Sequence, residues 1–308
     1  MEIKKILVTG SSGTIGTRLC EKLLEQNYEV VGVDLKPNQW DEKINELTII
    51  GDLCKKETIE KLPKDVDIVI HLAANARVYN LVVDPSLARD NFESVFNVLE
   101  YCRKNNIKRF VFSSSREVYG NIEKTVISED EARIANCESP YTASKIAGEA
   151  LVHSYNQCYG MDFIILRFSN VYGMYDTSDR MIPLFIKLTK DNSEIIVYGK
   201  EKLLDFTYID DTVSGVIKCI ENFDSVKGDI YNIASGKHIS IIEVAQMLQK
   251  HMNASSELRL EENRTGEVVR FVADISKAID KLDYEPKTPI DVGLKKSIDW
   301  YMENVYNE

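Results

Sequence analysis

Short apolar runs alternate with segments of helical length through the first half of the chain, and this rhythm limits the possible folds more than any other feature. The candidate strands cover residues 5–9, 29–33, 47–50, 66–71, 108–113 and 162–167, and the candidate helices lie near 14–26, 56–62, 86–105 and 138–159. Nearly continuous runs of Val, Ile and Leu are typical of parallel strands that are buried on both faces. The pattern therefore predicts an α/β fold with a doubly wound parallel (Rossmann) sheet.

The rhythm loosens after about residue 168. A loop at 172–179 precedes a candidate helix at 180–190, a strand at 195–198, a helix at 210–222, a strand at 229–233, a helix at 240–252 and a terminal helix at 291–306. We expect a Rossmann domain, of the kind that binds nucleotides, formed by residues 1–168 together with about 206–232. A smaller α/β substrate-binding lobe is expected from about 169–205 and 233–308.

Charge and composition exclude several classes of partner. The 308 residues include 38 Lys and Arg against 49 Asp and Glu, a formal net charge of −11, so neither nucleic acid nor an anionic membrane surface is expected to bind. No apolar run approaches the roughly 18 residues that a membrane helix requires. The N-terminus leads directly into the first strand without room for a signal peptide. Six scattered cysteines without a C-x-x-C pair predict reduced thiols in a cytoplasmic protein, and no metal site is expected.

A glycine-rich turn follows the first strand. The segment Gly10-Ser11-Ser12-Gly13-Thr14-Ile15-Gly16 leads into a helical pattern. Glycines permit a tight turn and a close approach of the backbone to a pyrophosphate, while the N–H groups at the helix start face the anion. Asp34 at the end of the second strand can accept hydrogen bonds from ribose hydroxyls and would repel a 2′-phosphate, which favours NAD over NADP. The alternative is an aspartate that only bonds its own loop.

Two further segments fit the same site. Asp52 follows the third strand, where it could face the cofactor or could cap the helix near 56–62. His71 closes the fourth strand and is interpreted as a packed histidine rather than a catalyst. The small side chains of Ala73 and Ala74 suit a backbone that lies flat against a cofactor.

Tyr141 and Lys145 form the candidate reacting pair. Their spacing of four places both side chains on one face of a helix. A phenol with a pKa near 10 is a poor base at neutral pH, but the Lys145 ammonium and the positive nicotinamide ring of NAD⁺ both favour the phenolate. We therefore expect a lowered pKa for Tyr141.

A run of serines follows the fifth strand, at Ser113, Ser114 and Ser115. Ligands of open parallel sheets bind beyond the carboxyl ends of the strands, so these hydroxyls should point into a cleft. Ser115 could hydrogen-bond a substrate hydroxyl while Tyr141 removes its proton. The alternative is a serine-rich turn without a role in binding.

Together these motifs resemble the extended short-chain dehydrogenase/reductase family, and they follow its order along nearly the whole chain. The likeness rests on Gly10-x-x-Gly13-x-x-Gly16, Asp52-Leu53, His71-Leu72-Ala73-Ala74, Asn91, Ser115, Tyr141-x-x-x-Lys145, 167–173, 205–211, Arg270 and 273–278. Within that family the chain is most similar to UDP-glucose and UDP-glucuronate 4-epimerases.

The resemblance implies roles for individual residues. Tyr141 would be the general base, Lys145 would hold the nicotinamide ribose, and Ser115 would bind the sugar O4. Asp52 and Leu53 would flank the adenine, and Asn91 would contact the cofactor. Asn170 and Arg270 would grip the diphosphate of a nucleotide sugar, most simply a UDP-sugar. The full set of cofactor-binding residues expected is Gly10, Gly13, Thr14, Ile15, Gly16, Asp34, Asp52, Leu53, Leu72, Ala73, Ala74, Asn91, Ser113, Tyr141, Lys145 and Val171. The helices near 86–105 and 138–159 resemble the pair through which the family often forms homodimers.

Three features depart from the simplest epimerase pattern. Leu204 stands where many relatives have an arginine, for which Lys200 or Lys202 could substitute. Glu117 stands where 4,6-dehydratases and hexuronate decarboxylases have a glutamate, and its role is either catalytic or structural. Arg116 replaces the aspartate that dehydratases place before this glutamate. The loop 174–180 differs from the common Gly-Pro-Arg sequence. Arg180 in this loop could contact a phosphate or a carboxylate, but it is interpreted as a solvated charge.

The sequence therefore predicts an NAD-dependent nucleotide-sugar 4-epimerase that oxidises the sugar transiently at C4. A decarboxylase, a 4,6-dehydratase or a 4-ketoreductase acting on a related sugar nucleotide is the alternative within the family. A protein that senses NAD without catalysis is the alternative outside enzymes, and the retention of Ser115, Tyr141 and Lys145 argues against it.

Overall fold

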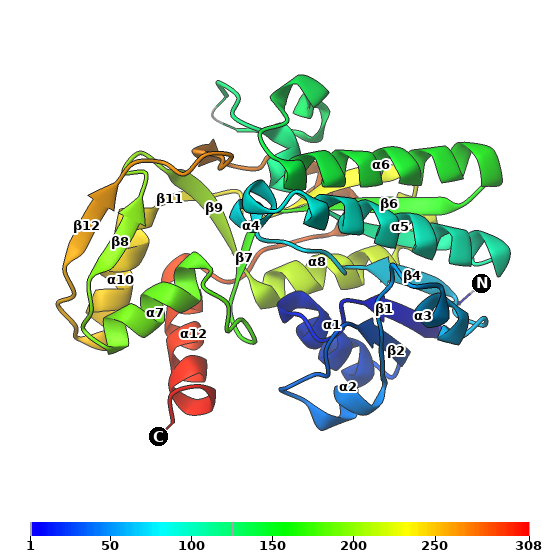
Figure 1. The fold of residues 1–308 in the computed structure, drawn as a ribbon, viewed down its shortest axis with the longest axis horizontal. Helices are drawn as coiled ribbons and strands as arrows, with labels where there is room; N and C mark the ends of the chain where they lie inside the picture. Colours follow the sequence, from blue (N-terminus) through cyan, green and yellow to red (C-terminus); the bar gives the residue numbers. More distant parts are fainter. Residues whose placement is uncertain (1, 125, 308) are drawn as a thin grey trace.

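The computed structural model describes residues 2–124 and 126–307, and a parallel sheet forms its centre (Figure 1). Seven strands lie in the order β10-β6-β5-β4-β1-β2-β3. Their bounds are β1 (Lys5–Thr9), β2 (Glu29–Asp34), β3 (Thr48–Ile50), β4 (Ile68–His71), β5 (Arg109–Ser115), β6 (Asp162–Phe168) and β10 (Asp229–Ile233). The prediction of a doubly wound parallel sheet is confirmed.

Successive residues of a strand point to opposite faces of the sheet. Because both sets of side chains are apolar here, helices cover both faces. Helices α1 (Thr14–Glu25) and α8 (Ile209–Glu221) pack on one face, and α5 (Ser86–Lys104) and α6 (Pro140–Tyr159) pack on the other (Figure 1). Ile6 and Val8 of β1 belong to the apolar cluster beneath α1 and α8, whereas Leu7 belongs to the cluster beneath α5 and α6. The central strands are therefore mainly apolar, because helices cover both faces of the sheet.

The other short elements of the first half complete the crossovers between these strands. They are α2 (Glu42–Glu46), α3 (Lys56–Lys61) and α4 (Val78–Val83). The sequence analysis missed α2 and α4, which have only five and six residues and so carry little helical periodicity.

A second group of elements lies beside the sheet, at the left of Figure 1. Strands β11 (His238–Ser240), β9 (Leu203–Tyr208) and β13 (Arg270–Phe271) form one small sheet, and β7 (Asn170–Tyr172) also pairs with β9. Strands β12 (Leu258–Glu261) and β8 (Ile195–Tyr198) form a second one. Helices α7 (Met181–Lys190), α10 (Ile241–Met252) and α12 (Ile290–Asn304) pack nearby. The short helices α9 (Phe223–Val226) and α11 (Ser276–Leu282) pack instead against α8, and α11 also contacts β10 of the central sheet. Strand β9 was not predicted, and the proposed lobe boundary at about residue 206 falls within it, so the division into lobes stays a proposal.

Asp205 holds the segments of the small sheet together. Its carboxylate is fully buried and accepts hydrogen bonds from the backbone N–H groups of Ser235 (2.9 Å) and Gly236 (2.9 Å). It also accepts a bond from the Ser235 hydroxyl (2.7 Å). A buried carboxylate needs several donors, and this one joins β9 to a turn about thirty residues later in the chain.

No helix within residues 2–124 and 126–307 is long and apolar enough to cross a membrane. All six cysteines have free thiols.

Candidate active site

A cavity of about 1050 Å³ extends across the carboxyl ends of the central strands. Its lining runs from the glycine turn after β1 to the ends of β5 and β6 and on to the small sheets. This is the edge at which open parallel sheets bind their ligands. The cavity therefore joins the predicted cofactor site to the predicted reacting centre.

The glycine turn has the shape that a dinucleotide requires. Gly10 has a φ of +73°, and a Cβ on Gly16 would lie 1.9 Å from the carbonyl oxygen of Gly10. Gly13 is the N-cap residue of α1, so the free N–H groups of the first helical turn face the cavity edge where the turn lies. This backbone cradle fits the pyrophosphate of NAD.

Every predicted cofactor-binding residue lines the cavity: Gly10, Gly13, Thr14, Ile15, Gly16, Asp34, Asp52, Leu53, Leu72, Ala73, Ala74, Asn91, Ser113, Tyr141, Lys145 and Val171. Their roles remain proposals. His71 does not line it and is fully buried, with its Nδ1 3.0 Å from the Thr9 hydroxyl. Burial lowers the pKa of His71 to about 3, so the ring is neutral and packs between strands, as the sequence analysis interpreted it.

Asp34 and Asp52 also serve their own loops. Asp34 accepts hydrogen bonds from the backbone N–H groups of Ser12 (3.0 Å) and Lys36 (3.1 Å). Asp52 accepts one from the N–H of Cys54 (2.9 Å), whereas the N-cap position of α3 is Lys55. The structure thus shows the loop contacts of Asp34, and its bond to a ribose stays a prediction. Asp52 stabilises the turn that precedes α3 and does not cap that helix.

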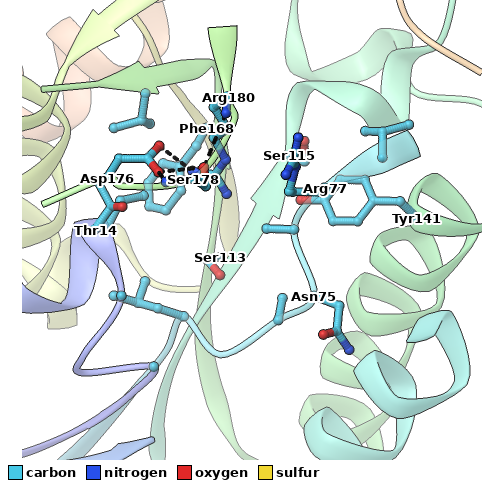
Figure 2. Close-up of a pocket in the computed structure, with 18 of the residues that line it drawn as sticks. Thr14, Asn75, Arg77, Ser113, Ser115, Tyr141, Phe168, Asp176, Ser178 and Arg180 are labelled. Carbon is cyan, nitrogen blue, oxygen red and sulfur yellow. Dashed lines mark hydrogen bonds and ion pairs between the residues drawn. The ribbon is translucent and has the colours of Figure 1, made fainter. Parts of the chain in front are cut away.

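Helix α6 carries the candidate base and its cation. Ser139 caps the helix by accepting a hydrogen bond from the Thr142 N–H (3.2 Å), and Pro140 occupies the first turn, where it requires no N–H partner. This start fixes Tyr141 and Lys145 against β5. The Lys145 Nζ donates to the Ser113 carbonyl (2.7 Å) and lies 5.8 Å from the centre of the Tyr141 ring. Figure 2 draws Ser115 and Tyr141 on the same side of the cavity, with Ser113 near the middle of the view.

The pKa of Tyr141 differs from the prediction. Burial raises it above its ordinary value, and a hydrogen bond with Ser115 opposes the rise only in part. Burial also lowers the pKa of Lys145 to about 8, which weakens its hold on the phenolate. The protein's own groups therefore do not lower the pKa of Tyr141, contrary to the prediction from its spacing to Lys145. A lowered pKa would need a further positive charge beside Tyr141, such as the nicotinamide ring of bound NAD⁺.

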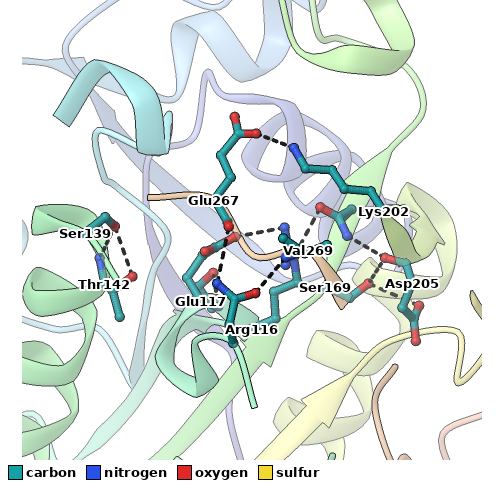
Figure 3. A network of polar contacts seen from close by, with 12 residues as sticks. Arg116, Glu117, Ser139, Thr142, Ser169, Lys202, Asp205, Glu267 and Val269 are labelled. Atoms are coloured by element: carbon teal, nitrogen blue, oxygen red, sulfur yellow. Dashed lines mark hydrogen bonds and ion pairs between the residues drawn. The ribbon is translucent and has the colours of Figure 1, made fainter. Parts of the chain in front are cut away.

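Next to Ser115, the short 3-10 helix η1 (Arg116–Tyr119) places a charged pair in the cavity wall (Figure 3). The Arg116 Nη2 and Glu117 Oε1 atoms are 2.8 Å apart, and both side chains are about nine-tenths buried. The Glu117 N–H donates to the Ser115 hydroxyl (3.2 Å). Burial raises the pKa of Glu117, while Arg116 acts in the opposite direction.

The two predicted diphosphate contacts are not brought together. Asn170 lines the cavity, but its amide oxygen accepts from the Arg116 Nε (3.2 Å) and its Nδ2 donates to the Asp205 carbonyl (2.7 Å). Arg270 is exposed and is absent from the cavity lining. The cavity instead contains Arg264, whose guanidinium carbon lies 3.9 Å from the centre of the Tyr198 ring. The sequence analysis predicted a role for neither Arg264 nor Tyr198.

Four other cavity cations have carboxylate partners: Arg77 with Asp179 (3.0 Å), Arg116 with Glu117, Arg180 with Asp176 (3.6 Å), and Lys202 with Glu267. Arg180 therefore lines the cavity, and its side chain is 39% exposed, which is compatible with the interpretation as a solvated charge. Lys202 also reaches the cavity beside Leu204, whereas Lys200 is exposed and does not line it.

Three side chains at the cofactor end could offer metal ligands. The ligand atoms of Cys54, Asp90 and Glu93 lie within 4.8 Å of one another. Nothing else indicates an ion there, and the expectation that the protein needs no metal stays a prediction.

The family comparison agrees with this geometry. The family described as "NAD dependent epimerase/dehydratase family" matches residues 6–234. The chain belongs to this family. The predicted resemblance is thereby confirmed, and so is NAD as the cofactor, since the family is defined by its dependence on it.

Relatives of this epimerase/dehydratase differ in what their names describe. A putative UDP-glucose 4-epimerase of Methanocaldococcus jannaschii is 35% identical, with 97% of this chain and 99% of that protein covered. Human dTDP-D-glucose 4,6-dehydratase is 29% identical, with coverages of 99% and 91%. The crystal structure of UDP-glucuronic acid 4-epimerase from Bacillus cereus, in complex with UDP-glucuronic acid and NAD, is 31% identical with a TM-score of 0.90, covering 97% of this chain and 99% of that one.

Proposed function

We propose that this family member is an NAD-dependent nucleotide-sugar 4-epimerase that acts on a UDP-sugar. The observation that carries the proposal is the position of Ser115, Tyr141 and Lys145 in one cavity with the glycine turn. A sugar bound beside Tyr141 would share that cavity with a dinucleotide on the turn. Relatives named for 4-epimerisation of UDP-glucose and UDP-glucuronate support the same reaction class.

Each of the three side chains would have a separate role in the proposed oxidation and reduction at C4. Bound NAD would accept a hydride from C4 of the sugar and return it, so the enzyme needs no external oxidant. Tyr141 would accept the proton of the C4 hydroxyl and give it back once the keto sugar has turned its other face to the site. The hydroxyl of Ser115 would hold O4 in reach of that phenol. Lys145, bonded to the Ser113 carbonyl, would keep the tyrosine and the cofactor ribose aligned.

Arg264 is proposed in place of Arg270 as the cation that binds the diphosphate. It lines the cavity, and among the described residues its guanidinium has ring contacts with Tyr79 and Tyr198 but no ion pair with a carboxylate. A planar guanidinium can bind two phosphate oxygens at once. The ring of Tyr198 beneath it offers a flat apolar surface on the same side of the cavity.

The base assignment is tested by replacing Tyr141 with Phe. We expect turnover to fall about 1,000-fold, the scale of a lost general base, while NAD binding measured by titration stays nearly unchanged. Tyr155 is the matched control because it lies on the same helix, outside the cavity, with its hydroxyl bonded to Glu100 (2.8 Å). Tyr155→Phe should keep its turnover. Near-normal rates in Tyr141→Phe would remove the tyrosine from the mechanism.

Product analysis by NMR separates the epimerase from its relatives' reactions. An epimerase gives a mixture of two C4 epimers of unchanged mass, a dehydratase loses water, and a decarboxylase loses carbon dioxide. The pairing of Glu117 with Arg116 supports epimerisation, because a carboxylate held in an ion pair is a poor acid or base for elimination.

We further propose that the enzyme is a homodimer that joins through α5 and α6. Phe92 and Phe96 on α5 are 40% and 42% exposed, and Tyr159 at the end of α6 is 47% exposed. Large exposed apolar side chains on two helices that contact each other are typical of a surface that binds another protein. A cytoplasmic location stays a prediction.

A further inference from the structure

The segment 174–180, here called the strap, connects β7 to α7 along the wall of the cavity. Its sequence departs from the Gly-Pro-Arg pattern common among relatives, and the proposed mechanism assigns it no role. Asp176, Ser178, Asp179 and Arg180 line the cavity, whereas Tyr175 is absent from the lining. Tyr175 packs instead on other parts of the protein, so the strap is fastened from outside the cavity.

Tyr175 fastens the first end of the strap to α1. Its carbonyl accepts a hydrogen bond from the Thr14 hydroxyl (3.4 Å), and its own hydroxyl donates to the Glu21 carboxylate (2.6 Å). The centre of its ring lies 6.0 Å from that of Trp40 and 5.2 Å from that of Trp300. Tyr175 has a φ of +67°, a backbone conformation that residues other than glycine adopt only when their surroundings hold them in it. These contacts therefore keep the strap in a conformation that it would not adopt alone.

Arg77 fastens the other end of the strap. Its Nη1 lies 3.0 Å from the Asp179 carboxylate, and its Nη2 donates to the Asp179 carbonyl (3.2 Å). Arg77 follows β4 and is the N-cap residue of α4. Figure 2 draws Thr14 beside Asp176 on one side of the view and Arg77 on the other. The strap thus joins the turn after β1 to the turn after β4.

A bound dinucleotide would have to cross the sheet edge where these two anchors lie. Asp34 follows β2 on the adenosine side, and Lys145 is bonded to β5 on the nicotinamide side. In the order of the sheet, β4 and β1 lie between β5 and β2. Thr14 follows β1 and Arg77 follows β4. NAD that reaches from Asp34 to Lys145 therefore passes both anchors of the strap.

We propose that the strap closes over bound NAD and limits the rate at which the cofactor enters and leaves the site. The inference depends on NAD binding and does not depend on which sugar the enzyme uses. The contacts that fasten the strap join protein groups to one another, so they oppose entry and release alike. Weakening them should speed both steps and leave the affinity for NAD nearly unchanged.

Tyr175→Ala tests the strap because it removes both the ring contacts and the hydroxyl. The enzyme loaded with NAD is mixed with an excess of isotopically labelled NAD, and mass spectrometry follows the exchange of the bound cofactor. We expect exchange to be at least about tenfold faster than in the wild type. The Kd for NAD, measured by titration, should stay within about threefold of the wild-type value.

Tyr306→Ala is the matched control. Tyr306 is a partly buried aromatic residue of the same apolar cluster, but it packs on Tyr301, with ring centres 6.3 Å apart, and lies outside the cavity. This variant should exchange NAD within about twofold of the wild-type rate, because distant sites act independently.

A second variant, Asp179→Ala, releases the other end of the strap. The Asp179 side chain is 75% exposed, so its loss does not endanger folding. We expect exchange to be about two- to fivefold faster, the scale of an exposed ion pair.

Unchanged exchange in folded Tyr175→Ala would overturn the inference. Faster exchange with an equal loss of affinity would overturn it as well, because Tyr175 would then shape the binding turn and not a closure. Faster exchange in Tyr306→Ala would show a general loosening of the fold and count against the strap. If Tyr175→Ala does not fold, an unchanged rate in Asp179→Ala decides against it. The exchange requires no turnover, so failure of the proposed 4-epimerase would leave this test intact.

Discussion

Lys145 places an ammonium where water has little access, since its side chain is 5% exposed. Burial lowers its pKa from 10.5 to about 8. The unfolded chain therefore binds more protons than the folded chain between about pH 8 and pH 10.5, so this group makes stability rise with pH across that window. Below pH 8 the buried charge costs about 3 kcal/mol.

Replacing Lys145 with Met should make the NAD-free protein more stable at pH 7, by about 2 kcal/mol once the lost bond to the Ser113 carbonyl is subtracted. The gain should shrink as the pH approaches 10, because the wild-type lysine then becomes neutral. Urea unfolding of both proteins at the two pH values measures the difference. If the variant is less stable than the wild type at pH 7, or if the difference in unfolding free energy does not change with pH, then burial does not destabilise the lysine. Turnover of the variant should be lost whatever its stability.

One pair of substitutions distinguishes Arg264 from Arg270 as the arginine that binds the diphosphate. Arg264→Ala should raise the KM for the nucleotide sugar about 100-fold, the scale expected when a charged bond to phosphate is lost. Arg270→Ala should leave KM within about twofold, because Arg270 is exposed outside the cavity. The two lie on the same segment, so steady-state kinetics on both variants forms a matched comparison. The reverse result would restore Arg270 as the diphosphate ligand.

At the scale of single elements, two glycines of the same turn are expected to have different roles, one in folding and one in cofactor binding. A Cβ on Gly16 would collide with the Gly10 carbonyl at 1.9 Å, whereas a Cβ on Gly13 would lie 3.3 Å from the same oxygen. Gly13 has a φ of −77°, which alanine adopts without strain. We therefore propose that Gly13 leaves room for a ligand, while Gly16 is needed by the turn itself.

Gly16→Ala should destabilise the NAD-free protein by several kcal/mol, since backbone must move to relieve the contact. Gly13→Ala should change the unfolding free energy by less than about 1 kcal/mol and weaken NAD binding at least about tenfold. Urea unfolding and NAD titration give the two measurements. If Gly13→Ala binds NAD normally, the pyrophosphate does not lie against this turn.

At the scale of the whole molecule, the α5–α6 surface predicts the oligomeric state. The wild-type enzyme should sediment as a dimer, and a Phe92→Asp/Phe96→Asp variant should sediment as a monomer, because burying two carboxylates in an apolar contact costs several kcal/mol. Ile134, 80% exposed on a different segment, supplies the control: Ile134→Asp should remain dimeric. A monomeric wild-type protein would exclude this interface.

The sequence was sufficient for features that depend on neighbours along the chain. Strand β1 was predicted at residues 5–9 and α1 from residue 14, as the structure has them, because apolar runs and the glycine turn encode backbone conformation locally. The shared position of Tyr141 and Lys145 on one helix face follows from helical geometry alone. Short elements such as β9 were missed because six residues with neighbours from three distant segments carry little local signal.

Only the tertiary structure decided which charges face the cavity and which are paired. Arg264 and Arg270 lie six positions apart in a segment without a strong period, so their directions depend on how that segment packs on distant strands. The same holds for Arg116, whose partners include Asn170, more than fifty residues away. The pKa of Tyr141 is another case, because burial depends on the whole fold while the spacing to Lys145 does not. Local patterns determine backbone and helix faces, whereas charge environment is a property of surfaces that distant segments build together.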